Sequence, residues 1–344
     1  MQKALKALFI GGTGTISAAI SKRCIQEGWE LYLLNRGNRV SAVPEGAKTI
    51  IGDIRNQEEI RQKLEGMEFD VVADFIAYDT ADVQRDIELF QGKTKQYFFI
   101  SSASAYQKPL SMPLITEGTP LVNPFWQYSR DKIAGEELLM AECRKNGFPV
   151  TIIRPSHTYS DQKVPLPLAG TKGSFSVLER MRRGKKVIVP GDGLTLWTLT
   201  HADDFAVAFC GLMGNIHAIG EVYHITGDEC LTWNQVYRAA AEALGVEAKI
   251  VHIASETLAE LHGEYYGSLL GDKSNCAIFD NGKIKRAVPA FNAVIRFDQG
   301  VRRTVESIYS HEEFQTPDPE FDAWCDGLIA AYEKAVEGFP RYEG

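Results

Sequence analysis

Short apolar runs alternate with helical stretches through the first half of the chain. The apolar runs lie at Ala7–Ile10, Leu31–Leu34, Thr49–Ile51, Val71–Ile76, Tyr97–Ile100 and Val150–Ile153. The helical candidates lie at Thr15–Glu27, Gln57–Leu64, Ala81–Phe90 and from Tyr128 to about Arg144. Near-continuous apolar strands separated by helices are typical of a parallel sheet covered on both faces. The pattern predicts an α/β fold with a doubly wound parallel sheet, whose ligands bind beyond the carboxyl ends of the strands.

The alternation stops after Pro155. Residues 156–200 are rich in proline and glycine and predict an irregular excursion, after which a strand at Val222–Ile225 and a helix at Trp233–Leu244 resume the pattern. We therefore expect a dinucleotide-binding domain at 1–155, completed by about 201–226. A smaller substrate-binding lobe is expected to form from 156–200 and 227–344.

Composition narrows the class of protein. The chain has 344 residues, 44% of them hydrophobic and 24% charged, as in ordinary globular proteins. Its net charge of −8 argues against DNA and anionic lipid as partners. No apolar stretch approaches the roughly 20 residues of a membrane span, and the N-terminal apolar run is too short for a signal sequence. Six separated cysteines without a CxxC pair favour a reduced, cytoplasmic setting over disulfides or zinc.

Residues 7–17, ALFIGGTGTIS, place Gly11, Gly14 and Ser17 between the first strand and the first helix. Glycine allows the backbone to turn tightly and to approach a pyrophosphate, whose charge the helix N-terminus accepts. A glycine-rich turn alone also occurs wherever a loop needs unusual backbone angles. Its position before an amphipathic helix favours a nucleotide site, with Ser17 as a small residue in the place of the third glycine.

The second strand ends in Leu34-Asn35-Arg36-Gly37. An acidic residue here holds the ribose 2′-hydroxyl of NAD, and this chain has none. Arg36, with Arg39 nearby, favours NADP over NAD because it can neutralise a 2′-phosphate; the alternative is a solvated cation of a turn. Asp53 follows the third strand and either accepts a hydrogen bond from adenine or caps the next helix.

Three further residues form a chemical set. Ser102 follows the fifth strand, and Tyr128 and Lys132 begin the long helix that comes next. Residues four apart lie on one helix face, and a neighbouring ammonium lowers the pKa of a phenol, so that it exchanges protons near neutral pH. YxxxK alone also occurs by chance on solvated helices. The order of glycine loop, serine, tyrosine and lysine makes this set a candidate catalytic site.

With these motifs in place, the chain resembles the extended and atypical short-chain dehydrogenase/reductases, the NAD(P)-dependent epimerase/dehydratase family. GGTGTIS, GDIRN, DFIAYD, SSASAY, YSRDK and IIRPSHTY carry the resemblance, which covers nearly the whole chain. It implies a Rossmann fold, a catalytic set of Ser102, Tyr128 and Lys132, and a possible homodimer. The cofactor-binding residues that it implies are Gly11, Thr13, Gly14, Thr15, Ile16, Asn35, Arg36, Asp53, Ile54, Phe75, Ala77, Tyr128, Lys132, Pro155 and His157.

One departure concerns the substrate. Nucleotide-sugar members of the family often carry an arginine four residues after GDG, where this chain has Trp197 in GDGLTLWTLTH. An indole side chain is uncharged and cannot form the paired, charge-assisted hydrogen bonds that an arginine makes to a diphosphate. A smaller or less anionic ligand is thereby favoured, with Ser104, Tyr106 and Trp197 as candidate substrate contacts. The atypical subgroup with similar LWTLTH segments also includes plastid RNA-associated relatives, so a binding role stays open.

Two remaining clusters have simpler interpretations. His201, Asp203 and Asp204 lack the spacing of a metal site, so we predict no metal and a cap for a helix near Asp204. The basic run at 179–186, ERMRRGKK, is interpreted as a solvated helix end, and no RNA contact is expected there.

These features predict an NAD(P)-dependent epimerase, dehydratase or reductase acting on a hydroxyl- or keto-bearing, sugar-like small molecule. The alternative is a dinucleotide sensor or RNA-associated protein of the same fold with little or no catalysis.

Overall fold

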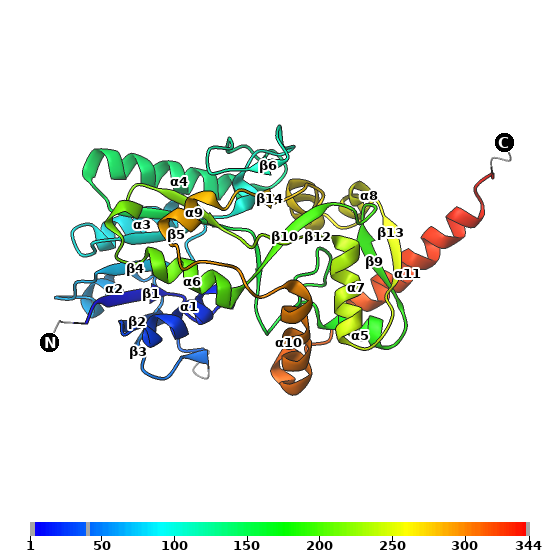
Figure 1. Ribbon diagram of the computed structural model, residues 1–344, viewed down its shortest axis with the longest axis horizontal. Helices are drawn as coiled ribbons and strands as arrows, with labels where there is room; N and C mark the ends of the chain where they lie inside the picture. The colour runs from blue at the N-terminus through cyan, green and yellow to red at the C-terminus, as the bar shows by residue number, and fades with distance from the viewer. Residues whose placement is uncertain (1–3, 39–41, 342–344) are drawn as a thin grey trace. The chain divides into compact units, whose positions relative to one another are not determined.

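The computed structural model describes residues 4–38 and 42–341, and its main feature is a seven-stranded sheet (Figure 1). The strand order is β11-β7-β5-β4-β1-β2-β3, and each neighbouring pair is parallel. The strands are β1 (Lys6–Ile10), β2 (Glu30–Asn35), β3 (Lys48–Ile51), β4 (Val71–Asp74), β5 (Tyr97–Ile100), β7 (Val150–Pro155) and β11 (Val222–Ile225). The predicted doubly wound parallel sheet is confirmed. Arg39 lies outside the described residues.

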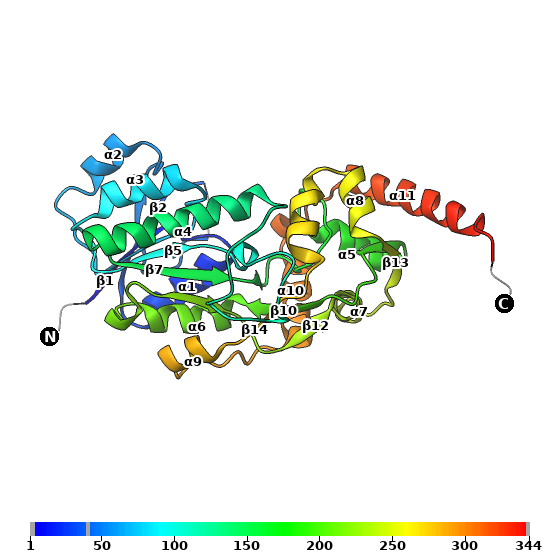
Figure 2. The same ribbon diagram turned by 90° about the horizontal axis from the view of Figure 1, so that it is seen from above.

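Helices cover both faces of this sheet (Figure 2). One face carries α1 (Thr15–Gln26) and α6 (Ala202–Leu212); the other carries α2 (Gln57–Lys63), α3 (Thr80–Phe90) and α4 (Gln127–Asn146). Side chains alternate along β1, so that Phe9 belongs to the hydrophobic cluster with α1 and α6 and Leu8 to the cluster with α2, α3 and α4. Burial on both faces explains why the central strands β1, β4 and β5 are almost entirely apolar in sequence.

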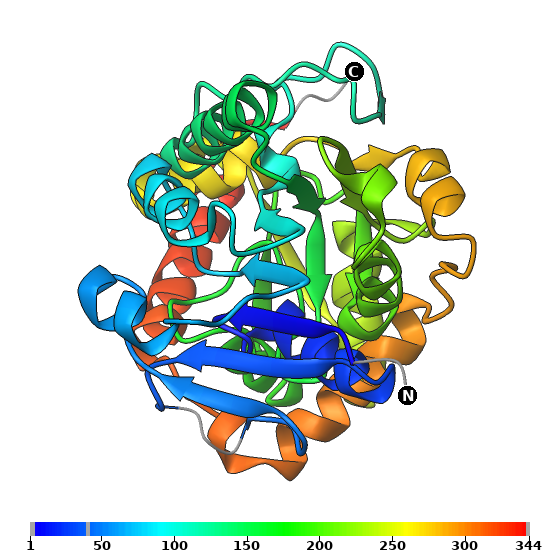
Figure 3. The same ribbon diagram turned by 90° about the vertical axis from the view of Figure 1, so that its left-hand side faces the viewer.

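The direction of winding reverses beside β1. From β1 the chain proceeds outward through β2 and β3, and it then returns to the other side of β1 to form β4 (Figure 3). In open α/β sheets a ligand crevice forms at such a reversal, outside the carboxyl ends of the strands. The glycine loop after β1 and the segment after β4 both lie at that end.

The chain divides into two compact units. The first consists of Met1–Tyr159, Thr198–Glu229 and Ala277–Ile295. The last of these segments contributes β14 (Ile278–Phe279), which pairs with β6 (Leu114–Ile115), and α9 (Gly282–Ala287). Val288 packs against Gly211 of α6. A Cβ on Gly211 would lie only 2.3 Å from Cγ1 of Val288, so a side chain would not fit there. The sequence predicts that this segment belongs to the substrate-binding lobe, whereas in the structure it belongs to the first unit.

The second unit consists of Ser160–Trp197, Cys230–Cys276 and Arg296–Gly344. Its parallel strand pair is β9 (Lys186–Pro190) and β13 (Lys249–Ile253), accompanied by β12 (Cys230–Thr232). Its helices are α5 (Phe175–Arg182), α7 (Trp233–Ala243), α8 (Ser255–Leu261), the π-helix at Tyr266–Lys273, α10 (Phe297–Ser310) and α11 (Pro319–Glu337). In the first unit, β8 (His157–Tyr159) pairs in parallel with the end of β10 (Leu196–His201).

The stretch 156–200 is therefore not an irregular excursion, since β8, α5, β9 and most of β10 lie within it. Among the described residues, no helix is long and apolar enough to cross a membrane.

Candidate active site

The glycine loop follows β1 and has no room for side chains at two positions. Gly11 has φ of +78°, and a Cβ there would lie 2.6 Å from Cγ2 of Ile76. A Cβ on Gly12 would lie 2.5 Å from Cδ2 of Leu33. Only glycine fits Gly11 without strain, because positive φ is costly for residues that carry a Cβ. The loop backbone is thus held close to β2 and to the segment after β4.

Ser17 ties this loop to the first turn of α1. Its buried hydroxyl accepts a hydrogen bond from the amide of Gly14 (2.8 Å) and donates one to the carbonyl of Gly11 (2.8 Å). The amide of Gly11 is itself engaged with the carbonyl of Leu34. The amides of Thr15 and Ile16 precede the first intrahelical bond of α1, from Ala18, and so remain as donors toward an anion.

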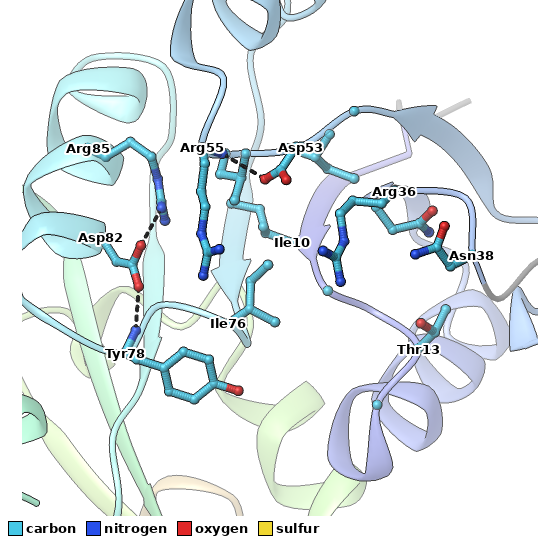
Figure 4. A pocket seen from close by; sticks show the side chains of 16 residues that line it. Ile10, Thr13, Arg36, Asn38, Asp53, Arg55, Ile76, Tyr78, Asp82 and Arg85 are labelled. Atoms are coloured by element: carbon cyan, nitrogen blue, oxygen red, sulfur yellow. Dashed lines mark hydrogen bonds and ion pairs between the residues drawn. The ribbon is translucent and has the colours of Figure 1, made fainter. Parts of the chain in front are cut away.

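A cavity of about 480 Å³ lies beside the loop (Figure 4). The predicted cofactor residues that line it are Gly11, Thr13, Gly14, Asn35, Arg36, Asp53 and Ile54. The remaining lining residues are Ile10, Leu34, Asn38, Gly52, Arg55, Ile76, Tyr78, Asp82 and Arg85. The structure thus gathers the residues after β1, β2 and β3 into one pocket, together with the segment after β4 that sequence reasoning had used only in part.

Hydrogen-bond donors dominate the end of the pocket beside β2. The Asn35 side-chain oxygen accepts from the amide of Gly37 (2.9 Å), which fixes the orientation of the amide group. Its Nδ2 is buried and has no hydrogen-bond partner among the described residues. Arg36 and Arg55 point their guanidinium groups into the pocket, and neither forms an ion pair within the described part of the chain (Figure 4). Asp53 also lines the pocket, and its Oδ1 accepts a hydrogen bond from the amide of Arg55 (3.1 Å).

The opposite wall contains a buried ion network. Arg85 donates to Asp82 (2.6 Å), to Asp86 (2.9 Å) and to Asp74 (3.2 Å). Asp74 also accepts the amides of Ile76 and Ala77, so it shapes the loop after β4. Burial raises the pKa of Asp86, and the charge of Asp74 raises it further. A proton on Asp86 lets two buried carboxyl groups lie beside one guanidinium.

Lys132 is held in place from β5 and from the loop after β4. Its buried ammonium donates to the carbonyl of Ala77 (2.6 Å) and to that of Ile100 (2.8 Å). It also lies 4.9 Å from the ring centroid of Tyr78 and 5.7 Å from that of Tyr128. Burial lowers the pKa of Lys132 to about 8. An ammonium has three protons, so one remains for a ligand.

Tyr128 lies in the first turn of α4 and is partly exposed. Its ring contacts Trp126 (4.9 Å between centroids) and Tyr78 (6.4 Å). Because Tyr78 also lines the pocket, it connects the glycine-loop cavity to the Tyr128–Lys132 pair. The predicted i, i+4 arrangement thus places a phenol and an ammonium side by side, next to the nucleotide pocket.

Ser102 lies just after β5 and caps the short 3₁₀ helix Ala103–Ala105. Its Oγ accepts from the amide of Ser104 (3.2 Å) and lies 2.9 Å from the Oγ of Ser104. Ser104 is buried and accepts a hydrogen bond from the hydroxyl of Ser129 (2.7 Å). Asn123 donates from Nδ2 to the carbonyl of Ser104 (2.8 Å) and accepts the amides that open α4.

Several predicted contact residues lie outside the cavity. The ring of Phe75 packs edge-on against Phe9 in the core. Ala77 and Pro155 are buried, and His157 pairs with Leu199 in the β8–β10 ladder. Thr15 and Ile16 belong to the first turn of α1. Tyr128 and Lys132 contact the lining residue Tyr78, and Ser102 is not among the residues that line the cavity.

All three predicted substrate contacts have almost no exposed surface, and Ser104 is 3% exposed. Tyr106 is fully buried, with its hydroxyl 3.1 Å from Nδ1 of His224. In the second unit, Trp197 is 2% exposed, stacks on Trp233 and donates from Nε1 to the carbonyl of Lys273. Neither side chain presents a face to a ligand in this conformation.

The residues His201, Asp203 and Asp204 lie at the start of α6. The helix predicted to start near Asp204 begins at Ala202, and its cap is His201, whose Nδ1 accepts from the amide of Asp203 (3.2 Å). Asp204 is buried and instead accepts the amide of Ile295 (2.9 Å). No group of three possible ligands for a metal ion occurs among the described residues.

The basic run is a solvated helix end, as predicted, at Arg182, Arg183 and Lys186, whose side chains are exposed, but Arg180 is buried. Arg180 is 2% exposed and pairs with Asp322 (2.6 Å) and Asp326 (2.8 Å) of α11. Lys185 pairs with the same two carboxylates, and Lys186 pairs with Glu333. The remaining cations of the run, Arg182 and Arg183, pair with Glu179.

The fold and the glycine-loop pocket together define a Rossmann-type dinucleotide-binding protein. Residues 7–226 match the NAD dependent epimerase/dehydratase family. The chain belongs to this family, which agrees with the resemblance seen in its sequence motifs. The match indicates an NAD-binding protein of the epimerase/dehydratase type.

Individual relatives agree on the fold and differ in their names. The chain is 28% identical over 261 residues to the chloroplast stem-loop binding protein of 41 kDa b of Arabidopsis thaliana, covering 72% of this chain and 65% of the relative. It is 26% identical over 163 residues to the UDP-glucose 4-epimerase of Streptomyces lividans, covering 41% and 49%. The aligned segments span less than two thirds of either relative.

A solved structure matches the fold over most of its length. This is the dTDP-glucose 4,6-dehydratase of Bacillus anthracis in complex with NAD, with a TM-score of 0.73 and 21% identity. The match covers 90% of this chain and 98% of that one.

Sequence reasoning missed four features of the site. Arg55 follows the predicted Asp53–Ile54 pair directly, and Tyr78 lies in the DFIAYD motif, so both were within reach of the motifs. Ser129 adjoins Tyr128, but a serine in a helix carries no distinctive signal. Asn123 precedes Pro124 ahead of α4, where an Asx turn was a reasonable expectation.

Proposed function

We propose that this protein is an NAD(P)-dependent epimerase, dehydratase or reductase that acts on a hydroxyl- or keto-bearing, sugar-like small molecule. The contact between Lys132 and the Tyr128 ring, adjoining the glycine-loop pocket through Tyr78, carries the proposal. The family match and the sugar-modifying relatives support it. A cytoplasmic location and a homodimer belong to the same proposal.

The residues present fit a dinucleotide. Gly11 and Gly14 bring the loop backbone to the pocket without side chains, and the buried Nδ2 of Asn35, a lining residue, has no hydrogen-bond partner among the described residues. When bound, the cofactor supplies hydride chemistry. Gly11, Thr13, Gly14, Thr15 and Ile16 would hold its diphosphate, and Asp53 and Ile54 its adenine. Phe75, Ala77, Pro155 and His157 would adjoin its nicotinamide half.

The catalytic roles follow from charge and geometry. Tyr128 would take the substrate hydroxyl proton in oxidation and return it in reduction. Lys132 keeps a positive charge beside the phenol below its pKa of about 8 and so stabilises phenolate. Ser102 would orient the substrate oxygen, with Ser104 close to it. Tyr106 and Trp197 would take part only after a conformational change, since both are buried here.

NADP is favoured over NAD because position 35 has no carboxylate and because Arg36 lines the pocket and has no ion-pair partner among the described residues. Co-purified dinucleotide identified by absorbance and mass tests this assignment. NADP in the protein supports it, NAD contradicts the preference, and failure to bind either added dinucleotide removes the enzyme proposal.

Turnover is then measured with UDP-glucose, dTDP-glucose and the corresponding free hexoses. The nucleotide-linked sugars test whether Trp197 is compatible with a diphosphate-bearing substrate, because it replaces the arginine of nucleotide-sugar members. Turnover of the free hexoses alone favours the smaller ligand.

A second candidate function is binding of stem-loop RNA, which the name of the Arabidopsis relative suggests. The basic run gives it little support, because its cations are paired with carboxylates of the same unit. Retention of labelled stem-loop RNA on nitrocellulose at 0.15 M salt tests it, with a tenfold excess of unlabelled duplex DNA as the control for non-specific binding.

A further inference from the structure

Three serine hydroxyls form a chain that ends at Ser102. Ser129 donates to Ser104 at 2.7 Å, and Ser104 lies 2.9 Å from Ser102. Ser129 is 0% and Ser104 is 3% exposed, so bulk water does not hydrogen-bond to either hydroxyl. Ser102 alone of the three is partly exposed.

The direction of this chain follows from proton counting. A serine hydroxyl has one proton and two lone pairs. Ser104 accepts the proton of Ser129. Geometry allows either hydroxyl of the Ser102–Ser104 pair to be the donor. We assign the donor role to Ser104, because its buried proton would otherwise have no acceptor among the described residues. Ser102 also accepts the amide of Ser104 at 3.2 Å, so both of its lone pairs are occupied. Its own proton has no acceptor among the described residues.

We infer that Ser104 and Ser129 are positioning residues that make Ser102 a permanent hydrogen-bond donor toward the substrate oxygen. This inference rests on the proposed function and refines the role of Ser102 within it. A serine that only donates stabilises a carbonyl or alkoxide oxygen and cannot accept the proton of a substrate hydroxyl. All proton exchange with the substrate then belongs to Tyr128.

Hydrogen bonds from Asn123 to the surrounding backbone hold the three serine hydroxyls in place. Asn123 is 2% exposed, and it links the carbonyl of Ser104 to the amides of Phe125 and Trp126 at the start of α4. The loop after β5, which carries Ser102, is therefore fixed to the helix that carries Tyr128. Such side chain–backbone bonds preorganise the donor and the phenol before a substrate arrives.

Neutron diffraction of the perdeuterated full-length protein tests the proton positions directly, without a substrate. We expect the deuteron of Ser129 to point at Ser104, that of Ser104 at Ser102, and that of Ser102 away from Ser104. A Ser102 deuteron that points at Ser104 would overturn the inference even if the protein proves to be an enzyme.

Kinetics provide a second measurement on whichever compound of the sugar panel shows Tyr128-dependent turnover. We expect Ser104→Ala to lower kcat about tenfold with little change in KM, since a hydrogen bond to a developing charge is lost. The double variant S102A/S104A is expected to be no slower than S102A, because Ser104 acts only through Ser102. Multiplicative losses in the double variant contradict the inference.

Ser101→Ala is the matched control. Ser101 is also buried after β5, but it donates to Glu136 and is outside the chain of hydroxyls. Ser101→Ala removes one serine hydroxyl from the same loop. We expect the deuteron directions at Ser102, Ser104 and Ser129 to stay the same, and the kcat ratio of S102A to S102A/S104A to stay the same as well. If no compound in the panel turns over, the proposed function fails and the neutron map still decides the direction of the chain.

Discussion

The ammonium of Lys132 lies 2.6 Å from the carbonyl oxygen of Ala77, which connects α4 to the loop that borders the glycine-loop pocket. Ala77 is itself fixed through its amide by the buried carboxylate of Asp74. The pocket wall and the proposed proton-transfer pair, Tyr128 and Lys132, are therefore both held by the loop after β4. A disturbance of the loop after β4 is expected to affect dinucleotide binding and chemistry together.

The burial of Lys132 makes folding stability depend on pH. The pKa of Lys132 is 10.5 when it is solvent-exposed and about 8 in the folded protein. Between pH 8 and 10.5 the unfolded state therefore binds more protons at this residue than the folded state does. The contribution of Lys132 to the free energy of unfolding rises with pH over this range. Relative to Lys132→Met, the wild-type free energy of unfolding should rise by up to about 3 kcal/mol from pH 8 to 10.5. Denaturant titrations of both proteins measure this, and parallel curves would contradict it.

Replacing Tyr128 with Phe tests the proposed acid–base group. We expect turnover to fall about 10²- to 10⁴-fold, the usual contribution of a general acid–base residue, with dinucleotide affinity nearly unchanged. Steady-state kinetics and dinucleotide titration provide the two readouts. Tyr32→Phe removes a phenol that bonds Glu30 on β2, outside the site, and serves as the control. Normal turnover in Y128F would exclude Tyr128 from the mechanism.

Arg36→Ala tests the preference for NADP. Loss of one charge-assisted contact to a phosphate is expected to weaken NADPH binding about 10- to 100-fold and to leave NADH binding nearly unchanged. Calorimetric titration with both dinucleotides gives the ratio. Arg61→Ala removes the same charge from α2, outside the pocket lining, and should not change it. Equal losses for the two dinucleotides would contradict the 2′-phosphate contact.

Asn35→Asp tests the same end of the pocket by adding a charge. The carboxylate repels a 2′-phosphate and accepts a 2′-hydroxyl, so we expect the preference to move toward NAD. Competition between NADH and NADPH on one sample measures the shift. An unchanged ratio would show that Asn35 does not contact the ribose.

Gly11→Ala separates backbone strain from crowding at the loop. Both Gly11 and Gly28 have positive φ, at +78° and +86°, but only at Gly11 would a Cβ meet a neighbour, Ile76 at 2.6 Å. We expect G28A to cost about 1 kcal/mol and G11A clearly more, together with a loss of dinucleotide affinity. Thermal unfolding and titration of both variants provide the comparison, and equal effects would contradict the crowding argument.

The sequence predicts the first unit well because its central strands are buried on both faces. Runs such as Tyr97–Ile100 are apolar at every position, and the glycine loop and YxxxK motif have fixed places relative to them. The second unit is harder, since β9 is a five-residue strand that ends in Pro190 amid turn residues. The placement of Ala277–Ile295 depends on the packing of Val288 beside Gly211, which no local pattern encodes.

The site shows the same division between local and long-range information. Ser102, Tyr128 and Lys132 are recognised by type and spacing, and Ser104 is predicted only as a substrate contact. Its hydrogen bond with Ser129 becomes visible only when the fold brings the loop after β5 and α4 together, with the two hydroxyls 2.7 Å apart. Likewise, the charges of the basic run look free until α11, more than 130 residues later, supplies their partners.

That arrangement has a practical consequence for work with shortened versions of the protein. A fragment that stops before α11 would lose Asp322, Asp326 and Glu333 and leave Arg180, Lys185 and Lys186 without counter-charges. Such a fragment would acquire a strongly positive face and attract polyanions by simple electrostatics. Affinity for nucleic acid measured on a truncated protein would then report the missing helix rather than a property of the intact chain.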